Sequence, residues 1–190
     1  MKKNFLTAIW FTLVTTVIFG LIYPLAVTGI SQLLFPRKAN GQLVERGGKL
    51  VGSRIVGQTF SGPQYFHSRP SSAGTGYDAT ASGGSNLAPT NKALIQRVAG
   101  DVQISQTDHP SKPVPIDLVT QSGSGLDPDI SPAAAEYQIG RVAQTRHMSE
   151  QSVCDLVKKH TRGRDFGFLG EPRVNVLELN LDLDDSQNRK

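Results

Sequence analysis

A stretch of 32 residues without a charged side chain, residues 5–36, constrains this chain more than any other feature of its sequence. An α-helix needs about 20 mainly apolar residues to cross the hydrocarbon core of a bilayer, so the stretch is long enough to span it. Residues 37–190 are more polar, rich in glycine and proline, and numerous enough for one domain with its own core. The sequence therefore predicts a single N-terminal transmembrane α-helix and one soluble domain.

A cleaved secretory signal peptide is the alternative, because Lys2 and Lys3 precede the apolar stretch. The apolar part of a signal peptide is typically about 7–15 residues long and ends in a small-x-small cleavage site. Here the apolar run continues through residues 23–25, and the nearest match to such a site ends in Thr28, where alanine is preferred. We therefore expect the segment to be retained as an anchor.

The charges beside the anchor do not determine its orientation. Lys2 and Lys3 precede it, and four Lys or Arg residues follow it within positions 37–49. Taken literally, the positive-inside rule opposes an N-terminus inside the cell, but long domains translocate largely regardless of charge.

A row of small and polar residues recurs every four positions along the anchor. Residues at this spacing drift slowly around a helix, so the first three share one face, where small residues let a second helix approach closely. We expect this face to pack against a membrane partner; the alternative is a lone anchor with incidental threonines. The proline in the row removes a helical hydrogen bond and predicts a kink, followed by a kinked exit to Pro36. The row consists of Thr12, Thr16, Gly20, Pro24, Thr28 and Gln32.

The composition of the soluble part argues against nucleic-acid binding and against an intramolecular disulfide. Beyond Lys3 the chain has 18 Lys and Arg against 16 Asp and Glu, which does not favour nucleic-acid binding. Cys154 is the only cysteine, so no intramolecular disulfide can form, and we expect a small core residue rather than a reactive thiol.

Periodicity predicts a mixed α/β (α+β) domain without internal repeats. Strands are expected where β-branched or alternating apolar residues occur, and helices where apolar residues recur at a spacing of three and four. The carboxylates at 182, 184 and 185 are expected to keep the C-terminal end soluble; the alternative is that they concentrate cations. The predicted elements are a strand or hairpin at 49–60, a long loop at 61–85, a helix at 89–102, a connector at 106–115, a short strand at 116–120, a helix from a Ser131 cap to about Arg146, a second helix from a Ser149 cap to about Gly163, and a half-buried strand at 173–183.

No complete catalytic or metal-binding motif is present in the sequence. The four histidines are far apart, and Asp127 and Asp129 lack the further ligands of a calcium loop. Two Gly-Ser segments, residues 82–86 and 122–125, precede predicted helices and have the composition of a phosphate cradle, although neither is a Walker motif. Ordinary loop chemistry is the alternative. The chain does not have the residues of a complete enzyme.

Several blocks of sequence resemble the C subunit (KdpC) of the bacterial high-affinity potassium-transporting P-type ATPase. The resemblance covers almost the whole chain, with small departures at Gln42 and Arg54. The blocks are Tyr-Pro-Leu at 23–25, Val-Gly-Gln-Thr-Phe at 56–60, Tyr-Phe-His-Ser-Arg-Pro-Ser at 65–71, Ser-Gly-Gly-Ser-Asn-Leu at 82–87, Asp-Leu-Val-Thr at 117–120, Ser-Gly-Ser-Gly-Leu-Asp-Pro at 122–128 and Arg-Val-Asn-Val-Leu-Glu-Leu-Asn at 173–180.

The resemblance implies a non-catalytic accessory subunit that stabilises an ATP-driven potassium pump. Its expected partners are an ATP-hydrolysing subunit, a channel-like potassium-conducting subunit and membrane lipid, with no nucleic acid. The expected place is the bacterial cytoplasmic (inner) membrane, with a cytoplasmic tail at 1–4, the membrane segment at 5–36 and a periplasmic domain at 37–190.

The resemblance also implies a catalytic chaperone that raises the ATP affinity of the hydrolysing subunit. The candidate nucleotide contacts are Ser122, Gly123, Ser124, Gly125 and Gln138. ATP is cytoplasmic, so this role conflicts with an exported domain. A membrane-tethered periplasmic enzyme or ligand-binding module, with His67 or Arg69 of the long loop in its site, is the alternative from another functional class.

Overall fold

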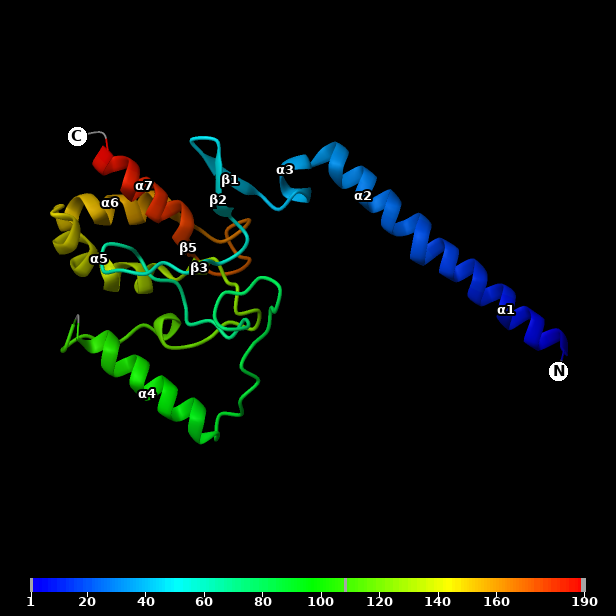
Figure 1. Cartoon of the computed structure of the whole chain (residues 1–190), viewed down its shortest axis with the longest axis horizontal. Coiled ribbons are helices and arrows are strands. Elements are labelled where there is room, and N and C mark those ends of the chain that lie inside the picture. The colour runs from blue at the N-terminus through cyan, green and yellow to red at the C-terminus, as the bar shows by residue number, and fades with distance from the viewer. Residues whose placement is uncertain (1, 108, 189–190) are drawn as a thin grey trace. The chain divides into compact units, whose positions relative to one another are not determined.

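The computed structural model describes residues 2–107 and 109–188 (Figure 1). The chain divides into two compact units, residues 1–43 and residues 44–190. Met1 of the predicted tail, Asp108 of the predicted connector and the last two residues of the predicted domain lie outside the described residues.

The first unit contains one long apolar helix, as the uncharged stretch predicts. It consists of α1 (Lys2–Val17), a π-helical turn (Ile18–Ile22) and α2 (Tyr23–Leu34). Over Lys2–Leu34 its most apolar window has a mean hydropathy of 2.2 and none of it is buried within the protein. By length and composition this helix is able to cross a membrane.

The helix is irregular just before Pro24 rather than after it. In the π-helical turn, the N–H of Tyr23 bonds to the carbonyl of Ile18, five residues back. Pro24 has no N–H to offer, and such a turn is a common adjustment beside a proline. The chain then continues as regular helix to Leu34, so the predicted kinked exit from Pro24 to Pro36 is replaced by a break at Phe35 and a short helix α3 (Pro36–Ala39).

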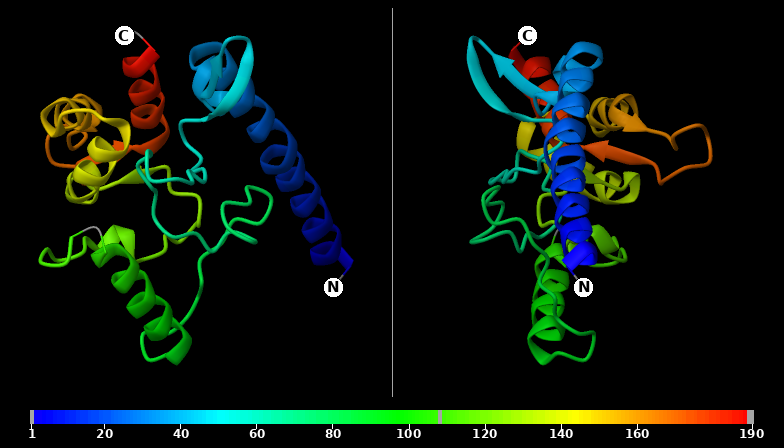
Figure 2. Two further views of the ribbon diagram at one scale, coloured as in Figure 1. Left: turned by 60° about the vertical axis from the view of Figure 1, so that its left-hand side comes forward. Right: turned by 90° about the vertical axis from the view of Figure 1, so that its right-hand side faces the viewer.

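The core of the second unit lies between three helices and a small antiparallel sheet. The helices are α5 (Pro132–Arg146), α6 (Glu150–His160) and α7 (Val176–Asn188). The sheet has the order β3 (Asp129–Ile130), β5 (Arg173–Asn175) and β4 (Thr161–Arg162), with Ile130 and Thr161 both paired to Val174. The segment between β4 and β5, orange in Figure 2, projects from the sheet. The fully buried core side chains include Phe66, Val142, Val153, Val174, Leu179 and Leu183.

The ends of α5 and α6 follow the predicted caps. The Ser131 hydroxyl accepts a hydrogen bond from the N–H of Ala134, and Pro132 occupies the first turn. His147, with φ of 54°, ends α5 in the left-handed conformation. Ser149 accepts from the N–H of Ser152 at the start of α6. The helix α6 ends at His160, earlier than predicted.

The predicted half-buried strand at 173–183 is wrong. Only β5, three residues long, is extended, and α7 begins at Val176. The leucines at alternate positions fit a strand, but the same segment has buried residues at 176, 179, 180 and 183, a spacing that fits a helix. In the structure, α7 packs against α6 and β5, so contacts with distant elements decide between the two periods.

Two smaller expectations also differ. The predicted strand at 116–120 is a 3-10 helix, Ile116–Leu118, closed by local bonds such as that from the Thr120 hydroxyl to the Ile116 carbonyl at 2.8 Å. The predicted hairpin at 49–60 is β1 (Leu43–Arg46) with β2 (Lys49–Ser53). The strand β1 precedes the predicted range and was not expected from the sequence.

The remaining elements agree more closely with the sequence. The helix α4 (Lys92–Gln106) overlaps the predicted helix at 89–102, but its cap is Asn91, whose side chain accepts from the N–H of Ala93. The long segment 61–85 has no helix or strand, as predicted.

Candidate functional site

Buried side-chain amides hold the middle of the long loop. Asn180 of α7 accepts from the N–H of Phe66 and donates to its carbonyl, both at 2.9 Å. Gln138 of α5 does the same for His67, at 2.7 and 3.1 Å. Each amide satisfies both backbone groups of one residue, as a neighbouring strand would do. We call residues 63–69 the clamped segment.

Two arginines of α5 bind the same segment. Arg141 donates to the carbonyls of Pro63 and Tyr65, at 2.6 and 3.0 Å, and to the Gln138 amide oxygen at 2.7 Å. Arg146, whose side chain is 4% exposed, donates to the carbonyl of Gln64 at 2.6 Å. The charge of Arg146 is compensated by the Asp184 carboxylate of α7, at 2.7 Å. The two guanidinium groups thus supply hydrogen bonds that the loop does not receive from a neighbouring strand.

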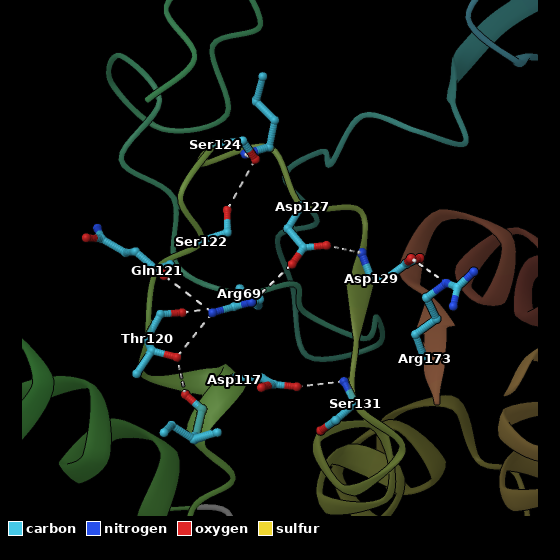
Figure 3. Close-up of polar contacts among 12 residues, drawn as sticks. Arg69, Asp117, Thr120, Gln121, Ser122, Ser124, Asp127, Asp129, Ser131 and Arg173 are labelled. Carbon is cyan, nitrogen blue, oxygen red and sulfur yellow. Dashed lines mark hydrogen bonds and ion pairs between the residues drawn. The ribbon is translucent and has the colours of Figure 1, made fainter. Parts of the chain in front are cut away.

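Arg69 joins the clamped segment to the loop at 120–127 (Figure 3). Its guanidinium group contacts Asp127 at 3.1 Å and donates to the carbonyls of Thr120 and Gln121, both at 3.3 Å. The hydroxyl of Tyr77 donates to the Arg69 carbonyl. Burial raises the pKa of Tyr77 above its ordinary value, which keeps this donor protonated.

The two Gly-Ser segments bind each other. The N–H of Gly83 and the hydroxyl of Ser82 both donate to the carbonyl of Ser124, at 2.9 and 3.0 Å. The Ser124 hydroxyl accepts from the N–H of Leu126 at 3.1 Å. Gly125 has a φ of +66°, and a Cβ there would lie 2.6 Å from a backbone nitrogen. These residues therefore form a tightly packed double loop.

Neither Gly-Ser segment lies at the start of a helix. The strand β3 separates Gly125 from α5, and residues 87–90 separate the other segment from the cap of α4. The anion-binding argument from helix N-termini therefore does not apply to either segment.

The structure does not bring the five predicted nucleotide contacts together. Gln138 and Arg141 line a cavity of about 510 Å³ with His67, Asp101 and Tyr137, whereas Ser122, Gly123, Ser124 and Gly125 are not among its lining residues. In the described part of the chain, the hydrogen bonds of Gln138 go to His67, Ala134 and Arg141. Nucleotide contact by these five residues stays a prediction.

A second hollow, of about 610 Å³, lies beside Arg69 and has walls of both charge signs. Asp129 accepts from Asn175 at 2.9 Å and faces Arg173 at 3.5 Å, and burial raises the pKa of Asp129. Among the described residues there is no group of three or more His, Cys, Asp or Glu side chains placed to hold a metal ion.

The carboxylates of α7 are ion-paired, and their expected role in solubility stays a prediction. Asp182 contacts Lys159 at 2.6 Å and His160 at 2.9 Å. Burial opposes ionisation of Asp182, but the hydrogen bonds with Lys159 and His160 outweigh it and lower the pKa of Asp182. The other two carboxylates, at 184 and 185, pair with Arg146 and Arg46.

The predicted packing face of the anchor is only partly free for a partner. Thr12, Thr16 and Gly20 are exposed, and a Cβ at Gly20 would lie 3.8 Å from the Thr16 methyl group, so these two share a face. Gln32, at the end of the row with Pro24 and Thr28, instead exchanges two hydrogen bonds with Asn40, at 3.1 and 3.3 Å.

Two buried polar residues that bind the clamped segment, Asn180 and Arg146, were not expected from the sequence. A polar residue within an apolar helical face is the signal for such a role. Asn180 has this position in α7, but the segment was interpreted as a strand, so its face was not recognised.

Comparisons with known proteins agree on one family. Residues 5–185 match the family model described as KdpC, K+-transporting ATPase, c chain. A potassium-transporting ATPase KdpC subunit from Koribacter versatilis is 58% identical over 187 residues, covering 98% of this chain and 97% of the relative. Proteins of the same description from Acidobacterium capsulatum and Methylococcus capsulatus are 57% and 56% identical, covering 94% and 97% of this chain and 96% and 98% of those relatives.

Proposed function

The chain belongs to the KdpC family of K+-transporting ATPase c chains, and is thus an accessory subunit of a potassium pump, and we propose that it serves to assemble and stabilise that pump. The proposed partners are the ATP-hydrolysing and channel-like subunits. The candidate membrane helix Lys2–Leu34 supports membrane association.

The observation that carries this proposal is that polar side chains of α5 and α7 bond to the backbone of the long loop. The amides and arginines that bind the clamped segment form their hydrogen bonds with the protein's own backbone. Such bonding gives the long loop one shape. A surface ordered before binding loses less conformational entropy on association, which suits a subunit that holds others together.

The anchor supports the same proposal through Thr16 and Gly20. Replacing both by leucine places bulk on the proposed packing face, and we expect co-purification of the pump subunits to fall. Thr15→Leu is the matched control, because Thr15 lies on another face and its hydroxyl bonds to carbonyls of its own helix. Equal recovery of the pump with the double variant and the control contradicts the packing role.

The proposed orientation places the N-terminus inside and the domain outside the cytoplasmic membrane. A reporter fused after Lys190 tests it, with an extracytoplasmic signal as the expected result. A cytoplasmic signal reverses the assignment and removes the objection that an exported domain does not meet ATP.

Nucleotide binding is a second proposal, favoured by the cavity beside Gln138. Its volume of about 510 Å³ is within the range of small-molecule sites, and Arg141 supplies a cation to its wall. The same cavity serves the alternative of a ligand-binding module. Titration of ATP against the full chain in detergent, with Gln138→Leu as the variant, tests the proposal. Absence of binding at millimolar ATP refutes direct contact.

A further inference from the structure

The segment between β4 and β5 exposes three large apolar side chains at its tip. Asp165 and Leu169 form an antiparallel bridge, and the N–H of Phe168 bonds to the Asp165 carbonyl at 3.3 Å. The exposed fractions of Phe166, Phe168 and Leu169 are 87%, 70% and 49%. Figure 2 shows this hairpin extending from the sheet. We call these three side chains the hairpin tip.

The backbone at the tip is also strained. Phe166 and Gly167 have φ of 54° and 83°, so both residues are in the left-handed region. The bridge between Asp165 and Leu169 encloses a three-residue turn, 166–168, in which glycine and asparagine tolerate positive φ better than a bulky side chain does. Gly167 fits this preference and Phe166 violates it.

Within the described part of the chain, no contact compensates for the exposure of the hairpin tip or for the positive φ of Phe166. The core cluster contains none of the three tip residues. The aromatic pairs and cation–π contacts of the described residues involve other rings. An exposed phenylalanine in a strained conformation therefore has its function outside this chain.

The charges around the tip indicate which class of surface it meets. Arg164 pairs with Glu171 at 2.8 Å, and Arg173 pairs with Asp165 at 3.3 Å. Both signs are presented to solvent, since the Arg164 and Glu171 side chains are 45% and 77% exposed. An apolar centre within a rim of mixed charge is the usual anatomy of a protein–protein interface.

A lipid surface fits this rim less well. Anionic headgroups are complementary to cations alone, and the arginines beside the tip are already paired with carboxylates. Asp165 directly precedes Phe166, so insertion of the ring would bring an exposed carboxylate to the headgroups.

We propose that the hairpin tip inserts into an apolar pocket on the extracytoplasmic surface of another subunit of the pump. Phe166 is the central anchor, and the ion pairs of Arg164 with Glu171 and of Arg173 with Asp165 form the polar rim of the contact. The inference rests on the proposed function, because it takes its partner from the pump.

The sharpest test is Phe166→Asn, which removes the ring and places a residue that tolerates positive φ in the turn. The Tm of the full chain should stay equal or rise, while the concentration needed for half-maximal assembly with the pump subunits should rise about tenfold, as for an aromatic hot spot. Phe166→Trp, which keeps an aromatic ring, should retain most of the assembly. Ile116→Asn removes a side chain that is 71% exposed on another element and should have no effect.

A photoreactive benzoylphenylalanine at position 166, in the intact membrane complex, identifies what the tip touches. A cross-link to a pump subunit supports the inference. A cross-link to lipid or to a second copy of this chain overturns it. Unchanged assembly of Phe166→Asn overturns it as well while leaving the proposed function in place, whereas failure of the wild-type chain to assemble refutes both.

Discussion

Replacement of Asn180 by leucine should be among the most destabilising single changes in the soluble domain. The residue is 1% exposed, and its amide bonds to both backbone groups of Phe66 at 2.9 Å. Leucine has a similar shape but offers no partner, so one N–H and one carbonyl become buried and unpaired. At about 1–3 kcal/mol for each unpaired group, the free energy of unfolding should fall by about 2–6 kcal/mol. Domains of this size are stable by only about 5–15 kcal/mol.

Urea unfolding of the full chain in detergent, followed by circular dichroism, measures this change. Ser186→Leu is the matched control on the same helix, because the Ser186 hydroxyl bonds to the nearby Leu183 carbonyl rather than to the long loop. It should change the free energy of unfolding by less than about 1 kcal/mol. Hydrogen exchange should accelerate at Phe66 in the Asn180 variant and not in the control. If both leucine variants unfold at the same urea concentration, the clamp contributes no stability and the argument from unpaired groups is wrong.

Three further predictions concern the rest of the domain. The pKa of Asp182 is lowered in the folded state, so its ion pairs stabilise the fold above about pH 4 and this contribution is lost as the pH falls below that value. The Tm difference between wild type and Asp182→Asn should therefore shrink from about pH 6 to about pH 3. Gly125→Ala should lower the free energy of unfolding by about 1–3 kcal/mol, whereas Gly123→Ala, with open space at its Cβ, should be near neutral in the same urea titration. Arg69→Lys keeps the charge but loses the fork that reaches the carbonyls at 120–121, so limited proteolysis should cut this loop faster than in wild type.

Elements set by local chemistry were predictable from the sequence. The long helix follows from a run of residues that lack charge, and the starts of α5 and α6 follow from Ser131 and Ser149. In each case the decisive interaction joins residues within four positions, or depends only on length and composition. The long irregular segment at 61–85 was predictable for the same reason, since it has no period.

The clamp was not predictable, because its bonds join residues far apart in sequence. Phe66 and Asn180 are 114 positions apart, and His67 and Gln138 are 71 apart. The strand predicted at 173–183 failed for a related reason: two periods coexist in the same leucines, and packing with distant elements decides between them. Gln138 was selected as a ligand contact, whereas its observed hydrogen bonds hold the backbone of the loop.

The clamped segment has a consequence for how the length of the long loop can vary. Each amide grips one residue, Asn180 at Phe66 and Gln138 at His67, so the chain is fixed residue by residue although it forms no strand. A single insertion or deletion within 63–69 would place the wrong side chain in the position of Phe66, which is fully buried. Insertions near Gly76, where a Cβ has open space, would leave the hydrogen bonds of these two amides intact. This loop should therefore tolerate added length on one side of Arg69 and reject it on the other.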